Sequence, residues 1–219
     1  MKKTLYICKM SVTKRITAGY LLQSKAIILD PANPFIWSSG WKSPIYCDNR
    51  KTLSHPEIRN FIRDNLCELI RVNYGIPDII AGVATGAIAQ GALVADRLGL
   101  PFIYVRSSAK DHGTGKLIEG DVTPGKSAIV VEDLVSTGGS SLRAVDALRN
   151  AGVNVLGMVA IFTYGFSVAE DNFREAGVKL NSLADYHTLI DSGVKSGYIQ
   201  PEYLDTLKKW REDPQKWRQ

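Results

Sequence analysis

The sequence predicts an α/β fold with an open, mainly parallel sheet that is covered by helices on both faces. Apolar, β-branched runs such as 129–131 are continuously hydrophobic, as strands are when both sides of a parallel sheet are buried. Amphipathic helical segments alternate with these runs, and such alternation favours right-handed crossovers between parallel strands. Polar loops follow the strands, so they are expected to converge at the carboxyl ends of the strands, where ligands bind in such sheets.

The individual elements follow from hydrophobic periodicity and from Pro and Gly stops. Continuous apolar runs predict strands at 78–83, 101–105, 129–131 and 153–162. Helical spacing predicts helices at 12–29, 55–74, 140–151, 167–176 and 182–190, and a basic, Trp-bearing helix in the tail. Between the first two helices, segment 34–50 is rich in aromatic, Gly and Pro residues, which is typical of a short hairpin.

Composition limits the classes of function. The chain has 219 residues, 45% hydrophobic and 22% charged, with a net charge of +5, which is ordinary for a globular protein. Its basic residues are spread out and lack interleaved aromatic clusters, so no nucleic-acid partner is predicted. No run of 18 apolar residues predicts a membrane span, and Lys9 interrupts the only candidate for a secretory signal. We therefore expect a cytoplasmic protein without a membrane partner.

Segment 128–142, AIVVEDLVSTGGSSL, carries the main chemical pattern. A buried strand is followed by Glu132 and Asp133, then by a Ser/Thr/Gly loop and the start of a helix, where N–H groups favour an anion. Two acids have the wrong sign for phosphate alone. A ribose 5-phosphate satisfies both halves, because its hydroxyls donate to the acids while its phosphate takes the N–H groups of 136–140. The alternative is an ordinary polar turn between a strand and a helix.

The run VVEDLVSTGGSS resembles the phosphoribosyl-pyrophosphate signature of the type I phosphoribosyltransferases, and the chain over about 21–164 is similar to the orotate-specific members of that family. The resemblance implies the type I phosphoribosyltransferase fold with a small N-terminal hood. It also implies a pentosyltransferase that makes orotidine 5′-monophosphate and diphosphate from orotate and phosphoribosyl pyrophosphate, in pyrimidine biosynthesis. The expected domains are 1–50, a helix and hood that binds the base, and 51–219, the catalytic core with the C-terminal helices.

The resemblance also implies roles for individual residues. RSSAKDHGTGKLIEG, 106–120, is similar to the family's catalytic loop, a mobile lid, although a solvated loop is the default interpretation of such a polar run. Ser107 stands where many relatives have lysine. The implied catalytic residues are Lys110, His112 and Asp133. The residues implied to bind phosphoribosyl pyrophosphate are Arg106, Lys110, His112, Glu132, Asp133, Leu134, Val135, Ser136, Thr137, Gly138, Gly139 and Ser140.

For the base, the resemblance points to segment 43–50, SPIYCDNR, as part of the hood. Tyr46, Cys47 and Ser136 are implied to bind orotate. The chain departs from the family pattern at Ser38 and Gly86, where relatives often carry lysine. The resemblance implies that loop 84–86 approaches the pyrophosphate closely, which glycine permits because it has no Cβ. The alternative is an ordinary tight turn between a strand and a helix.

Mg²⁺ is the implied cofactor, held mainly by the substrate rather than by a protein metal site. The implied assembly is a homodimer in which the lid reaches the neighbouring subunit's site. Two other functions are kept open. One is a phosphoribosyltransferase for another base, which would share the 132–140 segment but not the hood pattern. The other is a regulator that binds phosphoribosyl pyrophosphate without catalysis, in which loss of Lys110 and His112 would be expected.

Overall fold

The computed structural model describes residues 2–37, 40–108 and 117–217. The chain forms two compact units: the first contains residues 1–55 and 184–219, and the second contains residues 56–183. The first division lies close to the boundary predicted at residue 50, but the C-terminal residues belong to the same unit as the N-terminal ones. Compact units are not by themselves domains, so the division into domains 1–50 and 51–219 stays a prediction.

A six-stranded sheet organises the second unit, with the strand order β10-β9-β8-β5-β6-β7. Its strands are β5 (Ile79–Val83), β6 (Phe102–Val105), β7 (Ile118–Glu119), β8 (Ser127–Val135), β9 (Asn154–Thr163) and β10 (Leu180–Asp185). β5 pairs in parallel with both β6 and β8, and β8 pairs in parallel with β9. β7 is antiparallel to β6 at the edge. The predicted open, mainly parallel sheet is confirmed.

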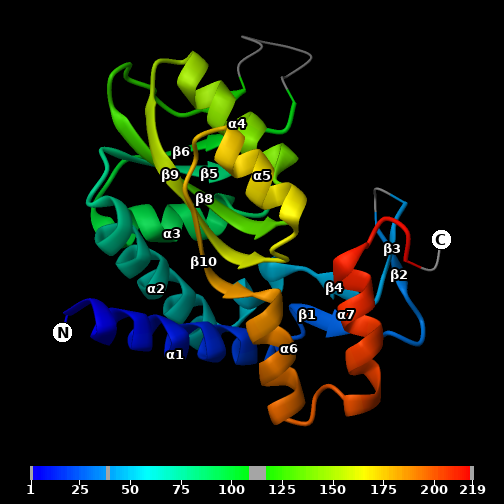
Figure 1. Ribbon diagram of the computed structural model, residues 1–219. Helices are drawn as coiled ribbons and strands as arrows, with labels where there is room; N and C mark the ends of the chain where they lie inside the picture. The colour runs from blue at the N-terminus through cyan, green and yellow to red at the C-terminus, as the bar shows by residue number, and fades with distance from the viewer. Residues whose placement is uncertain (1, 38–39, 109–116, 218–219) are drawn as a thin grey trace. The chain divides into compact units, whose positions relative to one another are not determined.

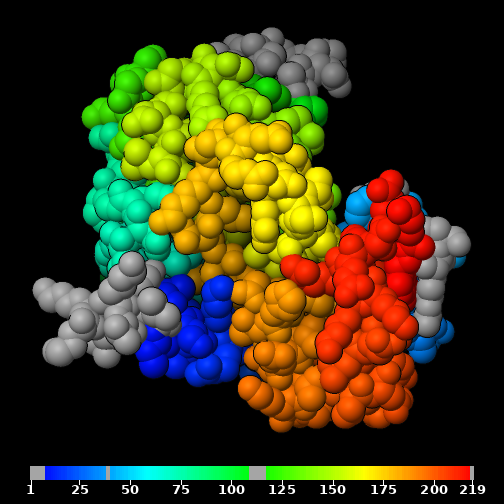
Figure 2. All heavy atoms as spheres, in the orientation of Figure 1, coloured from blue at the N-terminus to red at the C-terminus, as the bar shows by residue number. Residues whose placement is uncertain are grey.

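Helices cover both faces of this sheet, as predicted. α2 (Pro56–Tyr74) and α3 (Ile88–Leu98) lie on one face, and α4 (Gly139–Asn150) and α5 (Ser167–Glu175) lie on the other (Figure 1). All five residues of β5 are buried, because helices pack on both of its sides. Residues of β5, β8, α4 and α5, such as Val130, Val145 and Phe173, form one continuous apolar core. Figure 2 shows the outer surfaces of α4 and α5.

Strand β8 is longer than predicted. The hydrophobic pattern suggested a strand at 129–131 with a loop from Glu132 onward, but β8 continues to Val135. Pairing with the long strand β9 extends it, with Glu132 opposite Ala160 and Val135 opposite Thr163. Asp has a low strand propensity, and this is overridden by the pairing with a neighbouring strand. Both acids therefore lie on a rigid strand, and the loop before α4 is shorter than expected.

The first unit combines helices with two small antiparallel sheets. Its helices are α1 (Lys2–Gln23), η1 (Asn49–Ser54), α6 (Tyr186–Lys195), η2 (Pro201–Tyr203) and α7 (Leu204–Glu212). β1 (Ile27–Leu29) pairs with β4 (Ile45–Cys47), and β2 (Phe35–Ile36) pairs with β3 (Lys42–Ser43), so the hairpin expected at 34–50 is present. Trp210 of α7 donates its indole N–H to the carbonyl of Lys42 at 3.2 Å.

Two predicted helices are wrong in part. The helix expected at 12–29 begins at Lys2 and ends at Gln23, and 27–29 form β1 because they pair with β4. The helix expected at 182–190 begins only at Tyr186, after β10. Asp185 caps it, accepting the backbone N–H of Thr188 at 2.9 Å. In the part of the chain that the structure describes, no helix is long and apolar enough to cross a membrane.

Candidate active site

The start of helix α4 has the geometry of an anion site. Gly138 precedes the helix with φ of +84°, a conformation that favours glycine, and a Cβ there would lie 2.7 Å from a ring carbon of Phe173. Among the described residues, no side chain caps α4. The N–H groups of a first helical turn have no partner within the helix, so an anion can accept them here. Gly139 and Ser140 are exposed, which leaves this end of the helix accessible.

The two acids before the loop differ sharply in environment. Glu132 is only 4% exposed, whereas Asp133 is half-buried. One oxygen of Glu132, Oε1, accepts the backbone N–H of Asp133 at 2.9 Å, and the other, Oε2, accepts the hydroxyl of Ser141 at 2.7 Å. Burial raises the pKa of Glu132 well above its ordinary value, the charge of Asp133 raises it further, and the hydrogen bond from Ser141 acts against both.

Asp133 lies against the loop that follows β5. A Cβ built on Gly86 would overlap the Asp133 carboxylate, so any side chain at residue 86 would displace it. The loop is anchored at both ends: the N–H of Ala84 donates to the carbonyl of Val105 at 2.8 Å, and that of Ala87 to the carbonyl of Val83 at 3.0 Å. The structure thus brings together two of the predicted loops, 84–86 and 132–140, at the carboxyl ends of β5 and β8.

Helix α5 supports the 136–140 loop from the other side. The side-chain amide of Asn172 donates to the carbonyl of Thr137 at 2.9 Å. The neighbouring Tyr164 is 1% exposed, and its ring stacks on Phe166 with centroids 5.4 Å apart, so it is a core residue. The role of Asn172 was not predicted, because no local pattern relates this residue to a loop 35 residues earlier.

Ser141 was also missed, although a pattern could have found it. It begins the buried face of α4, which continues through Ala144, Val145 and Leu148. A polar residue on an otherwise apolar helix face is expected to have a buried hydrogen-bond partner. Here that partner is Glu132.

Arg106 lies at the base of the predicted lid, at the end of β6. Its N–H donates to the carbonyl of Leu117 at 2.8 Å, and its guanidinium Nη1 lies 3.5 Å from Oε1 of Glu119. The two ends of the lid segment are therefore joined where β6 and β7 pair. Lys110 and His112 lie outside the described residues.

The residues predicted to bind the base, Tyr46 and Cys47, lie on β4 in the first unit. Tyr46 is 41% exposed, and its ring centroid lies 5.6 Å from that of Phe35. The thiol of Cys47 donates to the side-chain oxygen of Asn49 at 3.4 Å. Ser136, the third residue predicted to bind the base, is half-buried in the second unit, after β8.

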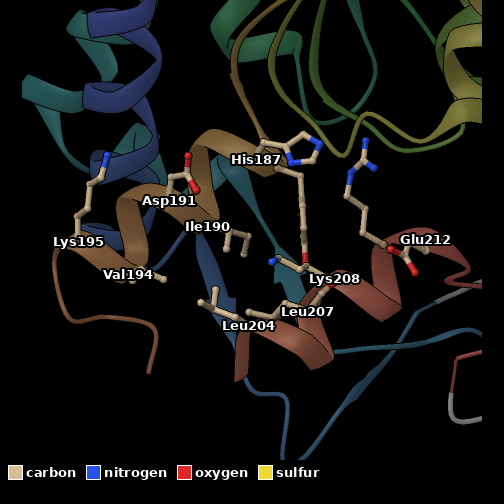
Figure 3. Close-up of a pocket in the computed structure, with 11 residues that line it drawn as sticks. His187, Ile190, Asp191, Val194, Lys195, Leu204, Leu207, Lys208 and Glu212 are labelled. Atoms are coloured by element: carbon tan, nitrogen blue, oxygen red, sulfur yellow. The ribbon is translucent and has the colours of Figure 1, made fainter. Parts of the chain in front are cut away.

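A separate cavity of about 390 Å³ lies between α6 and α7 of the first unit (Figure 3). Ile190, Val194, Leu204 and Leu207 supply apolar lining, and charged residues such as Lys208 surround it. None of the residues that line it is a predicted site residue. Among the described residues, no group of three or more His, Cys, Asp or Glu side chains could hold a metal ion.

Known proteins provide an independent comparison. The model of the phosphoribosyl transferase domain family matches residues 51–190. An orotate phosphoribosyltransferase of Porphyromonas gingivalis is 55% identical over 95% of this chain and 99% of its own length, and that of Bacteroides thetaiotaomicron is 57% identical over 95% and 98%. The crystal structure of orotate phosphoribosyltransferase from Aeropyrum pernix is 31% identical, with a TM-score of 0.72, and the match covers 84% of this chain and 99% of that one.

Proposed function

The chain belongs to the orotate phosphoribosyltransferase family, and we propose that its 132–140 segment binds the ribose 5-phosphate part of phosphoribosyl pyrophosphate during transfer to orotate. The observation that carries this proposal is the combination of a half-buried acid on a strand end with an uncapped helix N-terminus a few residues later. Few ligands need both. A ribose 5-phosphate does, since its hydroxyls donate and its phosphate accepts.

In the reaction, the bond between C1 of the ribose and the pyrophosphate oxygen breaks, and a bond from a ring nitrogen of orotate to C1 forms. The products are orotidine 5′-monophosphate and diphosphate. Positive charge develops on the ribose and negative charge on the leaving group. Catalysis is therefore expected to rest on positioning and electrostatics rather than on a covalent intermediate with the protein.

Asp133 is proposed to accept a ribose hydroxyl and to stabilise the positive charge that develops on the ribose. Its half-buried carboxylate supports this role, because a ligand can reach it. Glu132 is proposed to act beside it from a more buried position. The negative charge of Asp133 contributes to the raised pKa of Glu132, because the two adjacent carboxylates repel each other. A ligand that brings hydroxyl donors or positive charge would reduce this repulsion, so such a ligand is favoured.

The 5′-phosphate is proposed to accept N–H groups and hydroxyls of Ser136, Thr137, Gly138, Gly139 and Ser140, with Leu134 and Val135 forming the strand end behind them. The exposure of Gly139 and Ser140 at the start of α4 supports this assignment. The helix dipole adds a favourable interaction with the phosphate charge.

The pyrophosphate is proposed to be covered by the lid, through Arg106, Lys110 and His112, with Lys110 and His112 catalytic. Closure of such a segment excludes water and completes the set of cations around the leaving group.

We further propose a homodimer in which the lid of one subunit reaches the site of the other, and a cytoplasmic location. Tyr46, Cys47 and Ser136 are proposed to bind orotate.

Mg²⁺ is proposed as the cofactor, held chiefly by oxygens of the pyrophosphate and ribose. The side chains present fit this arrangement: both oxygens of Glu132 accept hydrogen bonds, from the N–H of Asp133 and the hydroxyl of Ser141, and among the described residues no group of three or more His, Cys, Asp or Glu side chains could supply a full set of protein ligands. When bound, the ion would neutralise charge on the leaving pyrophosphate.

The test follows the ultraviolet absorbance of orotate with purified protein, phosphoribosyl pyrophosphate and Mg²⁺, with uracil, adenine and hypoxanthine in parallel reactions. Orotate is expected to be consumed only when all components are present. Turnover of another base would contradict the orotate assignment while preserving the phosphoribosyl chemistry. Binding of phosphoribosyl pyrophosphate without turnover of any base would instead identify a regulator.

A further inference from the structure

Ser141 lies directly behind the acid pair. Its hydroxyl donates to Oε2 of Glu132 at 2.7 Å, and it is only 1% exposed. The N–H of Asp133 donates to the other oxygen of Glu132 at 2.9 Å. The carboxylate is thus held at both oxygens, and Ser141 supplies the one side-chain donor of the two.

The hydrogen bond between Ser141 and Glu132 joins two elements of the proposed site. Glu132 is near the end of β8, and Ser141 is in the first turn of α4, nine residues later. The intervening segment contains the loop proposed to hold the 5′-phosphate. This buried hydrogen bond therefore ties the strand that carries the acids to the helix whose start is proposed to bind the phosphate.

We propose that Ser141 is a positioning residue, which holds the Glu132 carboxylate in the orientation needed to bind the ribose of phosphoribosyl pyrophosphate. This inference rests on the proposed function of Glu132. Ser141 itself would not touch the substrate, because its hydroxyl is buried and directed at Glu132. Without that hydroxyl, Oε2 would lose its donor in a buried place, so the carboxylate would rotate or take up a proton. Either change would weaken ribose binding.

The experiment compares wild type, Ser141→Ala, Glu132→Gln and the double variant. Because a hydrogen bond to a charged group contributes more than a neutral one, Ser141→Ala is expected to lower kcat/KM for phosphoribosyl pyrophosphate about tenfold. The KM for orotate is expected to stay unchanged. If Ser141 acts through Glu132, adding Ser141→Ala to Glu132→Gln should cause little further loss. Independent, multiplying losses would overturn the proposal, as would a Ser141→Ala variant with the activity of wild type.

Ser127→Ala is the matched control. The hydroxyl of Ser127 also donates to a carboxylate, that of Asp78, at 2.7 Å. Ser127 is the first residue of β8, whereas Glu132 lies near the end of that strand. This variant is expected to keep kcat/KM for phosphoribosyl pyrophosphate. Ser141→Thr, which keeps the hydroxyl, is expected to retain most of the activity that Ser141→Ala loses. Circular dichroism and thermal unfolding report whether each variant folds. If Ser141→Ala does not fold, Ser141→Cys takes its place in the cycle, and failure of both to fold would overturn the proposal in favour of a purely structural role.

Failure of the inference can be told apart from failure of the proposed function. A wild-type protein that consumes no orotate would contradict the proposed function. A fully active Glu132→Gln variant would contradict the role of Glu132 and with it the inference. The inference alone would be contradicted by a third outcome. In that outcome wild type is active and Glu132→Gln is impaired, but Ser141→Ala causes a loss of activity that does not depend on Glu132.

Discussion

The two ends of strand β8 carry the same pair of groups in opposite settings. At its beginning, the hydroxyl of Ser127 donates to the Asp78 carboxylate at 2.7 Å. Near its end, the hydroxyl of Ser141 donates to the Glu132 carboxylate at the same distance. Asp78 is exposed and has further donors, the N–H of Ser127 at 2.8 Å and the ammonium of Lys126 at 3.2 Å. Glu132 is buried beside a second acid.

The pKa values move in opposite directions as a result. Hydrogen bonds from Ser127, together with Lys126, lower the pKa of Asp78 to about 2. Burial and the charge of Asp133 raise the pKa of Glu132 despite the bond from Ser141. A serine–carboxylate hydrogen bond therefore does not by itself determine the ionisation of the acid. At the beginning of β8, the surroundings of Asp78 favour its ionised form, which stabilises the fold. Near the end of β8, the surroundings of Glu132 disfavour its ionised form, and this is where a ligand is proposed to bind.

The largest effect on activity is expected from a side chain added beside Asp133, near the end of β8 where the ligand is proposed to bind. Gly86→Ala would place a Cβ on the Asp133 carboxylate and displace it. Asp133 is proposed to be catalytic, and small misplacements of catalytic groups are costly, so kcat/KM for phosphoribosyl pyrophosphate is expected to fall about 10²-fold. Steady-state kinetics would measure the loss.

Gly19→Ala in α1 is the control for that variant, because nothing lies within 4 Å of a Cβ there. It should leave the kinetics unchanged. If Gly86→Ala were as active as Gly19→Ala, then the position of Asp133 would not matter for turnover.

The next largest effect is expected for Glu132→Gln, which should change stability and activity in opposite directions. Its raised pKa means that the folded state binds the proton more strongly than the unfolded state does. The free energy of unfolding should therefore fall as the pH rises above the ordinary value of 4.5 toward the raised pKa. Glu132→Gln removes this loss, so the variant is expected to melt at a higher temperature than wild type at pH 8, with a smaller difference near pH 4.5.

The same variant is expected to lower kcat/KM for phosphoribosyl pyrophosphate, as the proposed role of Glu132 requires. Thermal melts across this pH range, together with kinetics, would measure both changes. A lower melting temperature for Glu132→Gln at pH 8 would mean that the acid stabilises the fold, which would remove the contrast with Asp78.

A smaller effect is expected at the loop support. Asn172→Ala removes the donor to the Thr137 carbonyl and should loosen the 136–140 loop, which is proposed to bind phosphate, without altering either acid. By the ordinary strength of one hydrogen bond, the Kd for phosphoribosyl pyrophosphate is expected to rise about five-fold. Isothermal titration with phosphoribosyl pyrophosphate would check this value, and unchanged affinity would show that the loop holds its shape without Asn172.

The smallest effect on activity is expected at the other end of the strand. The pKa of Asp78 is lowered from 3.8 to about 2, so its contribution to stability is present above pH 3.8 and is lost as the pH falls toward 2. Asp78→Asn should abolish this part of the acid dependence of unfolding and leave turnover at neutral pH unchanged. Acid unfolding followed by circular dichroism would measure it, and a loss of turnover would show that the two ends are coupled through β8.

Much of the fold follows from local patterns. The β-branched run 129–131 predicts a strand buried on both faces, and Ile129, Val130 and Val131 are all fully buried. The segment 132–140 predicts that a helix begins at its end, and α4 begins there, at Gly139. These features were predictable because periodicity and turn chemistry act between neighbouring residues.

Other features depend on partners that are distant along the chain. The sequence by itself determined the apolar strands, the acid pair and the glycine-bearing loop, because each depends on residues next to one another. Only the tertiary structure decided that β8 runs on to Val135 along β9, that Glu132 is buried against Ser141, and that Asn172 supports Thr137. Strand pairing, burial and hydrogen bonds between remote segments arise only when the chain is packed, and they are what makes one of two adjacent acids unlike the other.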